Sequence, residues 1–332
     1  MHLISTIQRL IKLFYIMSKI PSVDLSNFLS SNNDLKRDFV KKTGKAFQEI
    51  GFLSLKGHFL SKNCSENLYN QIKKFFDLPK NIKKKYEFDG VKGQRGYTSY
   101  GKEHAKGKKE GDLKEFWHFG QYSEKNEINL NYPKNIIIDE FPEFNTVGFE
   151  TYKALEKTGV YVLRAIALFL NLKENHFDKY VINGNSILRA IHYPPIIEEP
   201  KKAVRAAAHG DINLITLLMG AHGKGLQVKN NRGEWIDAIA EKDEIVINVG
   251  DMLSRYTNNK LKSTIHRVVN PPKKYWNKSR YSIPFFLHPI GSMNLNVLEN
   301  CTDTNNPKKY KDITAHDFLI NRLVDIGVMK KS

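Results

Sequence analysis

The sequence predicts a mixed α and β protein in which helices flank a β-rich core, and two observations support this prediction. Residues 146–172 form a long helical pattern that is strongly apolar in its second half, as expected for a scaffold helix. After about residue 185 the pattern changes to about eight short β-rich runs, separated by proline, glycine and asparagine turn signals. Short strands at this spacing predict a sandwich or a barrel, and eight is also the strand number of a jelly roll.

The N-terminal part alternates expected strands with expected helices. Residues 20–28, IPSVDLSNF, begin with strand-like alternation, and residues 52–57, FLSLKG, predict a second strand. Between them, residues 33–51 have helical periodicity and end at a glycine, which is typical of a helix C-terminus. Residues 61–79 predict another helix, which closes before a proline. Residues 86–120 are rich in glycine and lysine and are expected to be irregular, as lids and binding loops are.

The β-rich part supplies the core, and a helix predicted over residues 312–328 closes the chain. The eight expected strands lie at residues 186–193, 204–209, 214–220, 225–230, 233–239, 244–250, 263–270 and 280–289. We expect one fused unit, divided into an extension or misassigned start at 1–18, an N-terminal mixed α/β region at 19–180, a core at 181–292 and a C-terminal segment at 293–332.

The composition limits the partners of the protein. The chain has 332 residues and a formal net charge of +17, which raises the question of nucleic acid or a membrane as a partner. Its lysines are scattered in pairs, and no arginine-rich stripe with interleaved aromatic residues occurs. We therefore expect neither a nucleic-acid nor a membrane partner, and we expect the protein to be a monomer. The two cysteines, Cys64 and Cys301, form no CxxC motif, which fits a reducing cytoplasm.

The first residues, MHLISTIQRLIKLFYIM, are not expected to export or anchor the protein. Arg9 and Lys12 interrupt the apolar stretch, no small-residue cleavage site follows, and the stretch is too short to span a bilayer. Its apolar residues fall on one helical face, which predicts an amphipathic cap. The alternative is an over-long start, because MSKIPSVDLSNF from Met17 resembles a natural beginning.

A histidine and an aspartate separated by one residue occur twice, at His209-Gly-Asp211 and at His176-Phe-Asp178. With 11 histidines and 35 acidic residues in the chain, about one His-x-Asp/Glu match is expected by chance, so the context must decide. His176 and Asp178 follow the long helix in a polar segment, which is typical of surface or capping residues. His209 and Asp211 lie between two expected strands, where residues i and i+2 face the same side and can share one metal ion.

Two later groups of residues extend this site. His266, 55 positions after Asp211, lies in another expected strand and supplies a second imidazole. Two histidines and one carboxylate form the facial triad of non-haem Fe(II) oxygenases; zinc accepts the same atoms, but structural zinc sites usually have four protein ligands. Arg280 and Ser282, starting fourteen residues after His266, share one face of the last expected strand and are suited to hold a carboxylate.

The order His-x-Asp, His and Arg-x-Ser resembles the Fe(II)/2-oxoglutarate-dependent dioxygenase superfamily, and more narrowly its isopenicillin N synthase-like family. The segments GLQVKNNRGEWIDAI, IVINVGDMLSRYTNNKLKSTIHRVVNPP and RYSIPFFLHP are similar to the core of that family in order and spacing. IPSVDLSNF, AFQEIGFLSLKGH and KKFFDLP are similar to its N-terminal region, and RGYTSYGKEHAKG with DLKEFWHFG resembles bacterial members. The resemblance covers roughly residues 19–328 and implies a double-stranded β-helix, or jelly-roll, core.

The resemblance also implies roles for individual residues. His209, Asp211 and His266 would bind Fe(II), and Arg280 with Ser282 would hold the distal carboxylate of the cosubstrate 2-oxoglutarate. Tyr193, in the segment IHYPP, occupies the position of a tyrosine that helps to hold the other end of the cosubstrate in many relatives. Plant members often carry an asparagine where this chain has Ile191. Arg95 and Tyr97 lie in the segment that borders the substrate opening in relatives.

The implied function is an oxidoreductase that uses Fe(II), 2-oxoglutarate and O₂ to hydroxylate, desaturate or cyclise a small molecule, with release of succinate and CO₂. A first alternative is an iron-dependent oxidase of the same family that does not use 2-oxoglutarate, as isopenicillin N synthase itself does not. A second is an ethylene- and succinate-forming reaction on 2-oxoglutarate itself. A third, from another class, is a non-enzymatic binding protein that uses its positive charge to hold nucleic acid.

Overall fold

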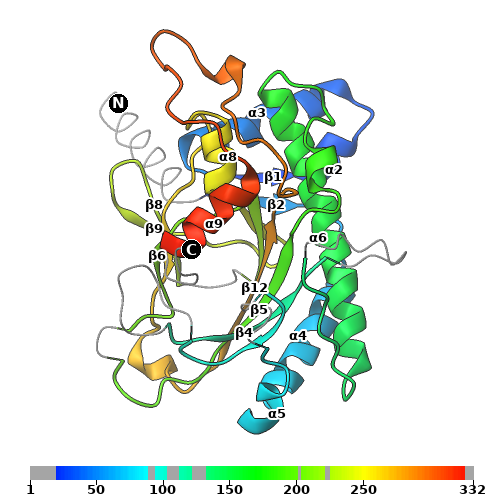
Figure 1. Ribbon diagram of the computed structural model, residues 1–332, viewed down its shortest axis with the longest axis vertical. Coiled ribbons are helices and arrows are strands. Elements are labelled where there is room, and N and C mark those ends of the chain that lie inside the picture. Colours follow the sequence, from blue (N-terminus) through cyan, green and yellow to red (C-terminus); the bar gives the residue numbers. More distant parts are fainter. Residues whose placement is uncertain are drawn as a thin grey trace, which may run out of the picture.

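The computed structural model describes residues 20–88, 94–102, 112–121, 132–200, 203–220 and 225–325 (Figure 1). The extension expected at residues 1–18 lies outside the described residues, and so does part of the irregular segment expected at 86–120. The same is true of the last residues of the expected closing helix.

Among the described residues, the strands form two sheets. The large sheet has the order β1-β2-β10-β7-β12-β5-β4-β3, and the small sheet has the order β6-β11-β8-β9. In chain order the strands are β1 (Ser22–Asp24), β2 (Phe52–Lys56), β3 (Gly96–Thr98), β4 (Glu115–Phe119), β5 (Ile187–Tyr193), β6 (Ala206–His209), β7 (Ile215–Met219), β8 (Leu226–Lys229), β9 (Trp235–Asp237), β10 (Ile245–Val249), β11 (His266–Val268) and β12 (Arg280–Leu287). Each of the eight runs predicted after residue 185 forms one strand, from β5 to β12, and the predicted class of fold is confirmed.

The long helices between residues 33 and 169 cover the large sheet on the side away from the small sheet, so this part of the structure has three layers (Figure 1). The helices are α2 (Leu25–Leu29), α3 (Asn33–Glu49), α4 (Lys62–Phe76), α5 (Lys80–Lys84), α6 (Pro142–Phe169), α7 (Asp178–Val181), α8 (Asp251–Tyr256) and α9 (Ala315–Asp325), with short 3-10 turns η2 (Lys273–Tyr275) and η3 (Glu299–Cys301). The expected scaffold helix is α6, and the expected closing helix is α9. No helix in the described ranges is both long enough and apolar enough to cross a membrane.

The scaffold helix approaches the sheet closely because a glycine faces it. A Cβ atom added to Gly159 of α6 would lie 2.8 Å from Cδ2 of Leu287 on β12 and 3.3 Å from Cδ1 of Leu217 on β7. Both leucines are fully buried in the main hydrophobic cluster. The close approach therefore places the rigid side of α6 directly behind the strands that carry part of the functional site.

The expectation that residues 86–120 are wholly irregular is wrong. This segment contains β3 and β4, which extend the large sheet by pairing with each other and with β5. The five residues of β4, EFWHF, are all buried, and Trp117 and Phe119 pack into the core. Runs of three and five residues carry little periodicity. What makes them strands is the pairing of β4 with β5, about 70 residues further along the chain, and of β3 with β4.

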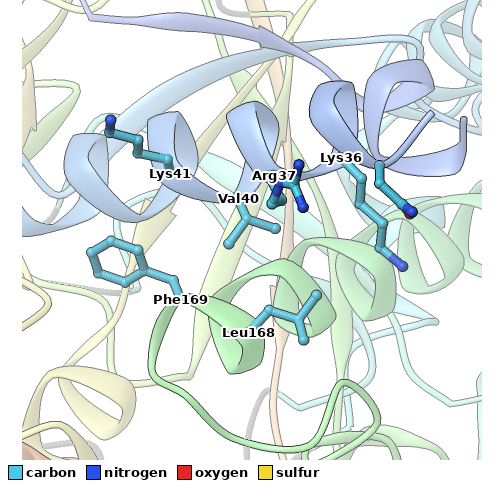
Figure 2. A pocket seen from close by; sticks show the side chains of 7 residues that line it. Lys36, Arg37, Val40, Lys41, Leu168 and Phe169 are labelled. Carbon is cyan, nitrogen blue, oxygen red and sulfur yellow. The ribbon is translucent and has the colours of Figure 1, made fainter.

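The helical layer also forms a surface groove of about 450 Å³ between α3 and the end of α6 (Figure 2). Its walls combine basic side chains of α3, among them Lys36 and Lys41, with the apolar side chains of Leu168 and Phe169. The ring of Phe169 packs directly on α3, because a Cβ atom at Gly44 would lie 2.1 Å from that ring. The groove shares no lining residue with the functional site described below.

One carboxyl group of the scaffold helix makes the stability of the protein depend on pH. Burial raises the pKa of Glu156 to about 7, which nearby Lys153 only partly offsets, and Oε1 of Glu156 is buried without a hydrogen-bond partner. The unfolded chain releases this proton near pH 4.5, whereas the folded chain holds it until about pH 7. The fold therefore loses stability as the pH rises through this interval.

We expect Glu156→Gln to stabilise the protein by about 2 kcal/mol at pH 8 and to have little effect at pH 4.5, because glutamine replaces the neutral acid without a charge. Urea unfolding at both pH values measures the difference. An equal effect at the two pH values would contradict the assignment of a raised pKa.

Candidate metal centre and carboxylate site

Three side chains on the small sheet form a cluster of possible metal ligands. His209 ends β6 and His266 begins β11, and the two are direct partners in the antiparallel register; Asp211 follows in the turn after β6. Nε2 of His209 lies 3.8 Å, and Nε2 of His266 lies 3.7 Å, from Oδ1 of Asp211. Within the described parts of the chain, this is the only group of three or more His, Cys, Asp or Glu side chains close enough to hold one metal ion.

Hydrogen bonds to the backbone orient both imidazoles. Nδ1 of His209 donates to the carbonyl oxygen of Ala207 at 2.7 Å, and Nδ1 of His266 donates to that of Thr264 at 3.2 Å. Because a carbonyl oxygen only accepts, each neutral ring carries its proton on Nδ1 and keeps a lone pair on Nε2. That is the tautomer required for metal ligation through Nε2.

The two carboxylate oxygens of Asp211 have different surroundings. Oδ2 accepts hydrogen bonds from Oγ1 of Thr216 at 2.6 Å and from Nδ2 of Asn248 at 2.8 Å, whereas Oδ1 faces the two imidazoles. Burial opposes ionisation, but the positive charges that His266 and His209 can carry and these two hydrogen bonds together hold the pKa of Asp211 below its ordinary value. Asp211 is therefore an oriented carboxylate anion at neutral pH.

The donor set fits a divalent transition metal. Desolvation, followed by the charge of His266, lowers the pKa of His209 to about 4, although 44% of its side chain is exposed. The ring is thus neutral at pH 7 and able to ligate. Two imidazoles and one carboxylate occupy one face of a metal and leave positions open for other molecules, and the exposed edge of His209 marks the open side.

The large sheet presents a carboxylate-binding pair of residues. Arg280 on β12 is the register partner of Tyr193 on β5, and its guanidinium carbon lies 5.2 Å from the centre of the tyrosine ring. Ser282, two residues further along β12, is buried and points to the same face. Nη1 of Arg280 is buried without a hydrogen-bond partner, and this arginine forms no ion pair with any acid in the described residues. Its charge is therefore available to a bound anion.

The structure does not bring Arg95 and Tyr97 into this cluster. Arg95 is almost completely buried and donates hydrogen bonds to the carbonyl oxygen of Gln94 at 2.7 Å and to Oδ1 of Asn185 at 3.4 Å. The hydroxyl group of Tyr97 donates to the carboxylate of Glu115. Tyr97 thus belongs to a buried polar network under the sheet.

Sequence reasoning missed the two residues that orient Asp211. Thr216 and Asn248 lie in β7 and β10, inside the apolar runs ITLLM and IVINV. A single polar residue in a fully buried strand needs a hydrogen-bond partner, and that signal was available in both runs. Their common partner depends on the pairing of β7 with β10, which sets Thr216 opposite Asn248 and is not encoded in either run alone.

Comparisons with known proteins assign the chain to a family. Residues 20–140 match the model of the non-haem dioxygenase N-terminal domain, described from morphine synthesis, and residues 184–289 match the 2OG-Fe(II) oxygenase superfamily model. A solved structure from Caulobacter crescentus, assigned to the 2OG-Fe(II) oxygenase family, is 41% identical with a TM-score of 0.83, covering 92% of this chain and 99% of that one.

Two further relatives are informative about ligands. A full-length Neurospora crassa protein, solved in complex with alpha-KG (2-oxoglutarate) and thymine, is 31% identical with a TM-score of 0.80, over 92% of this chain and 96% of that one. A 1-aminocyclopropane-1-carboxylate oxidase from Dictyostelium mucoroides is 32% identical over 82% of each chain.

The fold and the donor set define a jelly-roll protein with a centre of two histidines and one carboxylate for a non-haem metal. The chain belongs to the 2OG-Fe(II) oxygenase superfamily. Membership of that superfamily assigns it to the Fe(II)/2-oxoglutarate-dependent oxidoreductases, which confirms the class of enzyme expected from the sequence.

Proposed function

We propose that His209, Asp211 and His266 bind Fe(II), and that Arg280 and Ser282 bind the distal carboxylate of 2-oxoglutarate. The observation that supports this most directly is the orientation of the three ligand atoms. Both Nε2 atoms and Oδ1 of Asp211 face one point, while every other polar atom of these side chains is engaged elsewhere. Tyr193 packs against Arg280 and lines the same site.

The protein residues have two tasks in this proposal, to hold the metal and to hold the cosubstrate. The bound iron, with 2-oxoglutarate and O₂, supplies the oxidising chemistry that ends in succinate, CO₂ and an oxidised substrate. The two histidines and Asp211 would hold the metal on one side and leave its other side open. Arg280 and Ser282 hold the far end of the cosubstrate, so that its 2-oxo acid end is directed to the metal.

We further propose that the substrate is a small molecule that undergoes hydroxylation, desaturation or ring closure. Support comes from the similarity over 92% of this chain to the Neurospora crassa protein, whose complex contains thymine. The exposed edge of His209 provides the side from which such a molecule can approach the metal.

Purified protein supplied with Fe(II), O₂ and 2-oxoglutarate is expected to form succinate, and a panel of small molecules is expected to increase the rate when a substrate is present. Removal of the metal with a chelator should stop succinate formation, and adding Fe(II) back should restore it. Absence of succinate with the metal bound and a broad panel present would contradict the proposed use of 2-oxoglutarate.

A second candidate is an oxidase that binds iron but does not consume 2-oxoglutarate. The observation that favours it is the 32% identity to a 1-aminocyclopropane-1-carboxylate oxidase. Iron-dependent O₂ consumption without succinate would support this candidate. Ethylene in the headspace together with succinate, in reactions that contain 2-oxoglutarate alone, would instead indicate fragmentation of the cosubstrate.

A further inference from the structure

A second arginine lies beside the carboxylate-binding pair. Arg205 immediately precedes β6, is 6% exposed, and places its guanidinium carbon 5.7 Å from the centre of the Tyr193 ring. Arg280 lies 5.2 Å from the centre of the same ring. Two buried or half-buried guanidinium groups, one from each sheet, thus meet at one tyrosine, and we call Arg205 and Arg280 the arginine pair.

The structure gives the charge of Arg205 no compensating acid. Its Nε is buried without a hydrogen-bond partner, and its Nη2 makes only a long hydrogen bond, of 3.4 Å, to the carbonyl oxygen of Lys278. Across the described ranges of the chain, no carboxylate forms an ion pair with either member of the arginine pair. Burial, followed by the like charge of Arg280, lowers the pKa of Arg205 to about 10, so the group stays charged at neutral pH.

A purely structural role does not account for this arrangement. Packing on Tyr193 needs one cation at most, and Arg280 already supplies it. Two buried positive charges without an acid repel each other and lose their hydration, which destabilises the fold. The hydroxyl group of Tyr69 is also buried without a partner and lies within the electrostatic reach of Arg280. Three hydrogen-bond donors around the arginine pair therefore lack an acceptor: Nε of Arg205, Nη1 of Arg280 and the hydroxyl group of Tyr69.

We propose that Arg205 is a second guanidinium ligand for the distal carboxylate of 2-oxoglutarate and selects dicarboxylic over monocarboxylic 2-oxo acids. This inference rests on the proposed function of Arg280 and Ser282. A carboxylate between the arginine pair accepts from both groups and neutralises their repulsion. Arg205 lies four residues before His209, or about 13 Å of extended chain, so one strand segment carries both a metal ligand and a ligand for the far end of the cosubstrate.

The test measures binding and not turnover. Isothermal titration calorimetry of the Mn(II)-loaded full chain compares 2-oxoglutarate with 2-oxopentanoate, which has the same chain length but no distal carboxylate. We expect Arg205→Gln to raise the Kd of 2-oxoglutarate about 10- to 100-fold, the loss of one charge-assisted interaction, or about 1.4 to 2.8 kcal/mol. The Kd of 2-oxopentanoate should change less than about threefold.

Two further variants sharpen the comparison. Arg205→Lys keeps the charge but not the planar fork of donors, so we expect an intermediate Kd for 2-oxoglutarate. The control is Arg164→Gln, which removes the same charge from an arginine that has its own partner, Asp178, at 2.7 Å. That control should leave the binding of both ligands unchanged.

Thermal unfolding without ligand separates a binding role from a structural one. Because Arg205 is an uncompensated buried charge, Arg205→Gln should leave the Tm unchanged or raise it, whereas loss of a structural contact lowers it. Three results for Arg205→Gln would overturn the proposal. They are an equal rise in the Kd of both 2-oxo acids, an unchanged Kd of 2-oxoglutarate, and a lower Tm together with weaker binding of both ligands. Failure of the unsubstituted protein to bind 2-oxoglutarate would instead contradict the proposed function itself.

Discussion

Asp211→Ala is expected to abolish metal-dependent turnover and to weaken Mn(II) or Fe(II) binding by at least about 100-fold. Loss of a residue that only supports a metal ligand costs about 10- to 100-fold, and Asp211 supplies the single carboxylate of the cluster. Its removal also deprives Thr216 and Asn248 of their shared acceptor. Calorimetric metal titration and the succinate assay measure the two losses independently.

The variant should nevertheless fold. The two donors left without an acceptor cost about 1 to 3 kcal/mol, an amount that the removal of a buried negative charge partly offsets. Circular dichroism and Tm of the metal-free protein check this. The second His-x-Asp match in the chain offers a matched control: Asp178 pairs with Arg164 at 2.7 Å and Nε2 of His176 lies 2.9 Å from the hydroxyl of Tyr256. Asp178→Ala should keep metal binding and turnover, and retained turnover in Asp211→Ala would refute the site.

Lys83→Met is expected to destabilise the protein by about 3 to 5 kcal/mol, because it leaves a buried carboxylate without its cation. Nζ of Lys83 donates to the two carboxylate oxygens of Glu115 at 2.8 and 3.0 Å, and both side chains are at most 10% exposed. Glu115 also accepts from the hydroxyl of Tyr97 and lies 2.8 Å from Nδ1 of His192. Urea unfolding at pH 7 measures the loss.

The pH dependence of this loss identifies its cause. Burial opposes ionisation of Glu115, but the hydrogen bonds from His192, Lys83 and Tyr97 and the charge of Lys83 hold its pKa below the ordinary value of 4.5. In the unsubstituted protein this group therefore contributes stability above pH 4.5, and the contribution is lost as the pH falls through the lowered pKa. In Lys83→Met the unpaired carboxylate of Glu115 protonates more easily. The loss in free energy of unfolding relative to the unsubstituted protein should therefore become smaller as the pH falls.

Two comparisons complete the experiment. Combining Lys83→Met with Glu115→Gln removes both charges, and the pair should cost less than the sum of the single changes. Lys36→Met breaks an ion pair with Glu174 of similar length, 2.9 Å, whose side chains are 30% and 38% exposed, and should cost less than about 1 kcal/mol. Equal losses for the two lysines would contradict the importance of the buried pair.

The buried network around Glu115 lies next to the proposed carboxylate site. His192 lies between Glu115 and Tyr281 in the register of three adjacent strands, β4, β5 and β12, and its ring stacks on Tyr281 at 4.8 Å. The next register pair along β5 and β12 is Tyr193 and Arg280. The network on one face of the sheet thus supports the strands that carry the carboxylate site on the other.

The sequence by itself determined the class of fold and the proposed metal ligands. The pattern of alternation predicts that His209 and Asp211 face one side, and the eight β-rich runs with their turn signals predict where His266, Arg280 and Ser282 fall. Residue spacing and short β-rich runs are local properties of the sequence. They can therefore be identified without knowing which strands are neighbours.

Only the tertiary structure decided the features that depend on partners distant in the chain. β4 is a strand because β5 pairs with it, and β3 because it pairs with β4. Tyr97 belongs to a buried network because Glu115 and Lys83 reach it from other elements. The pairing of Arg205 with Arg280 requires the two sheets to face each other across Tyr193. Hydrogen bonding and burial are properties of such pairs, and the free energy of a charged side chain follows from its neighbours and not from its position in the sequence.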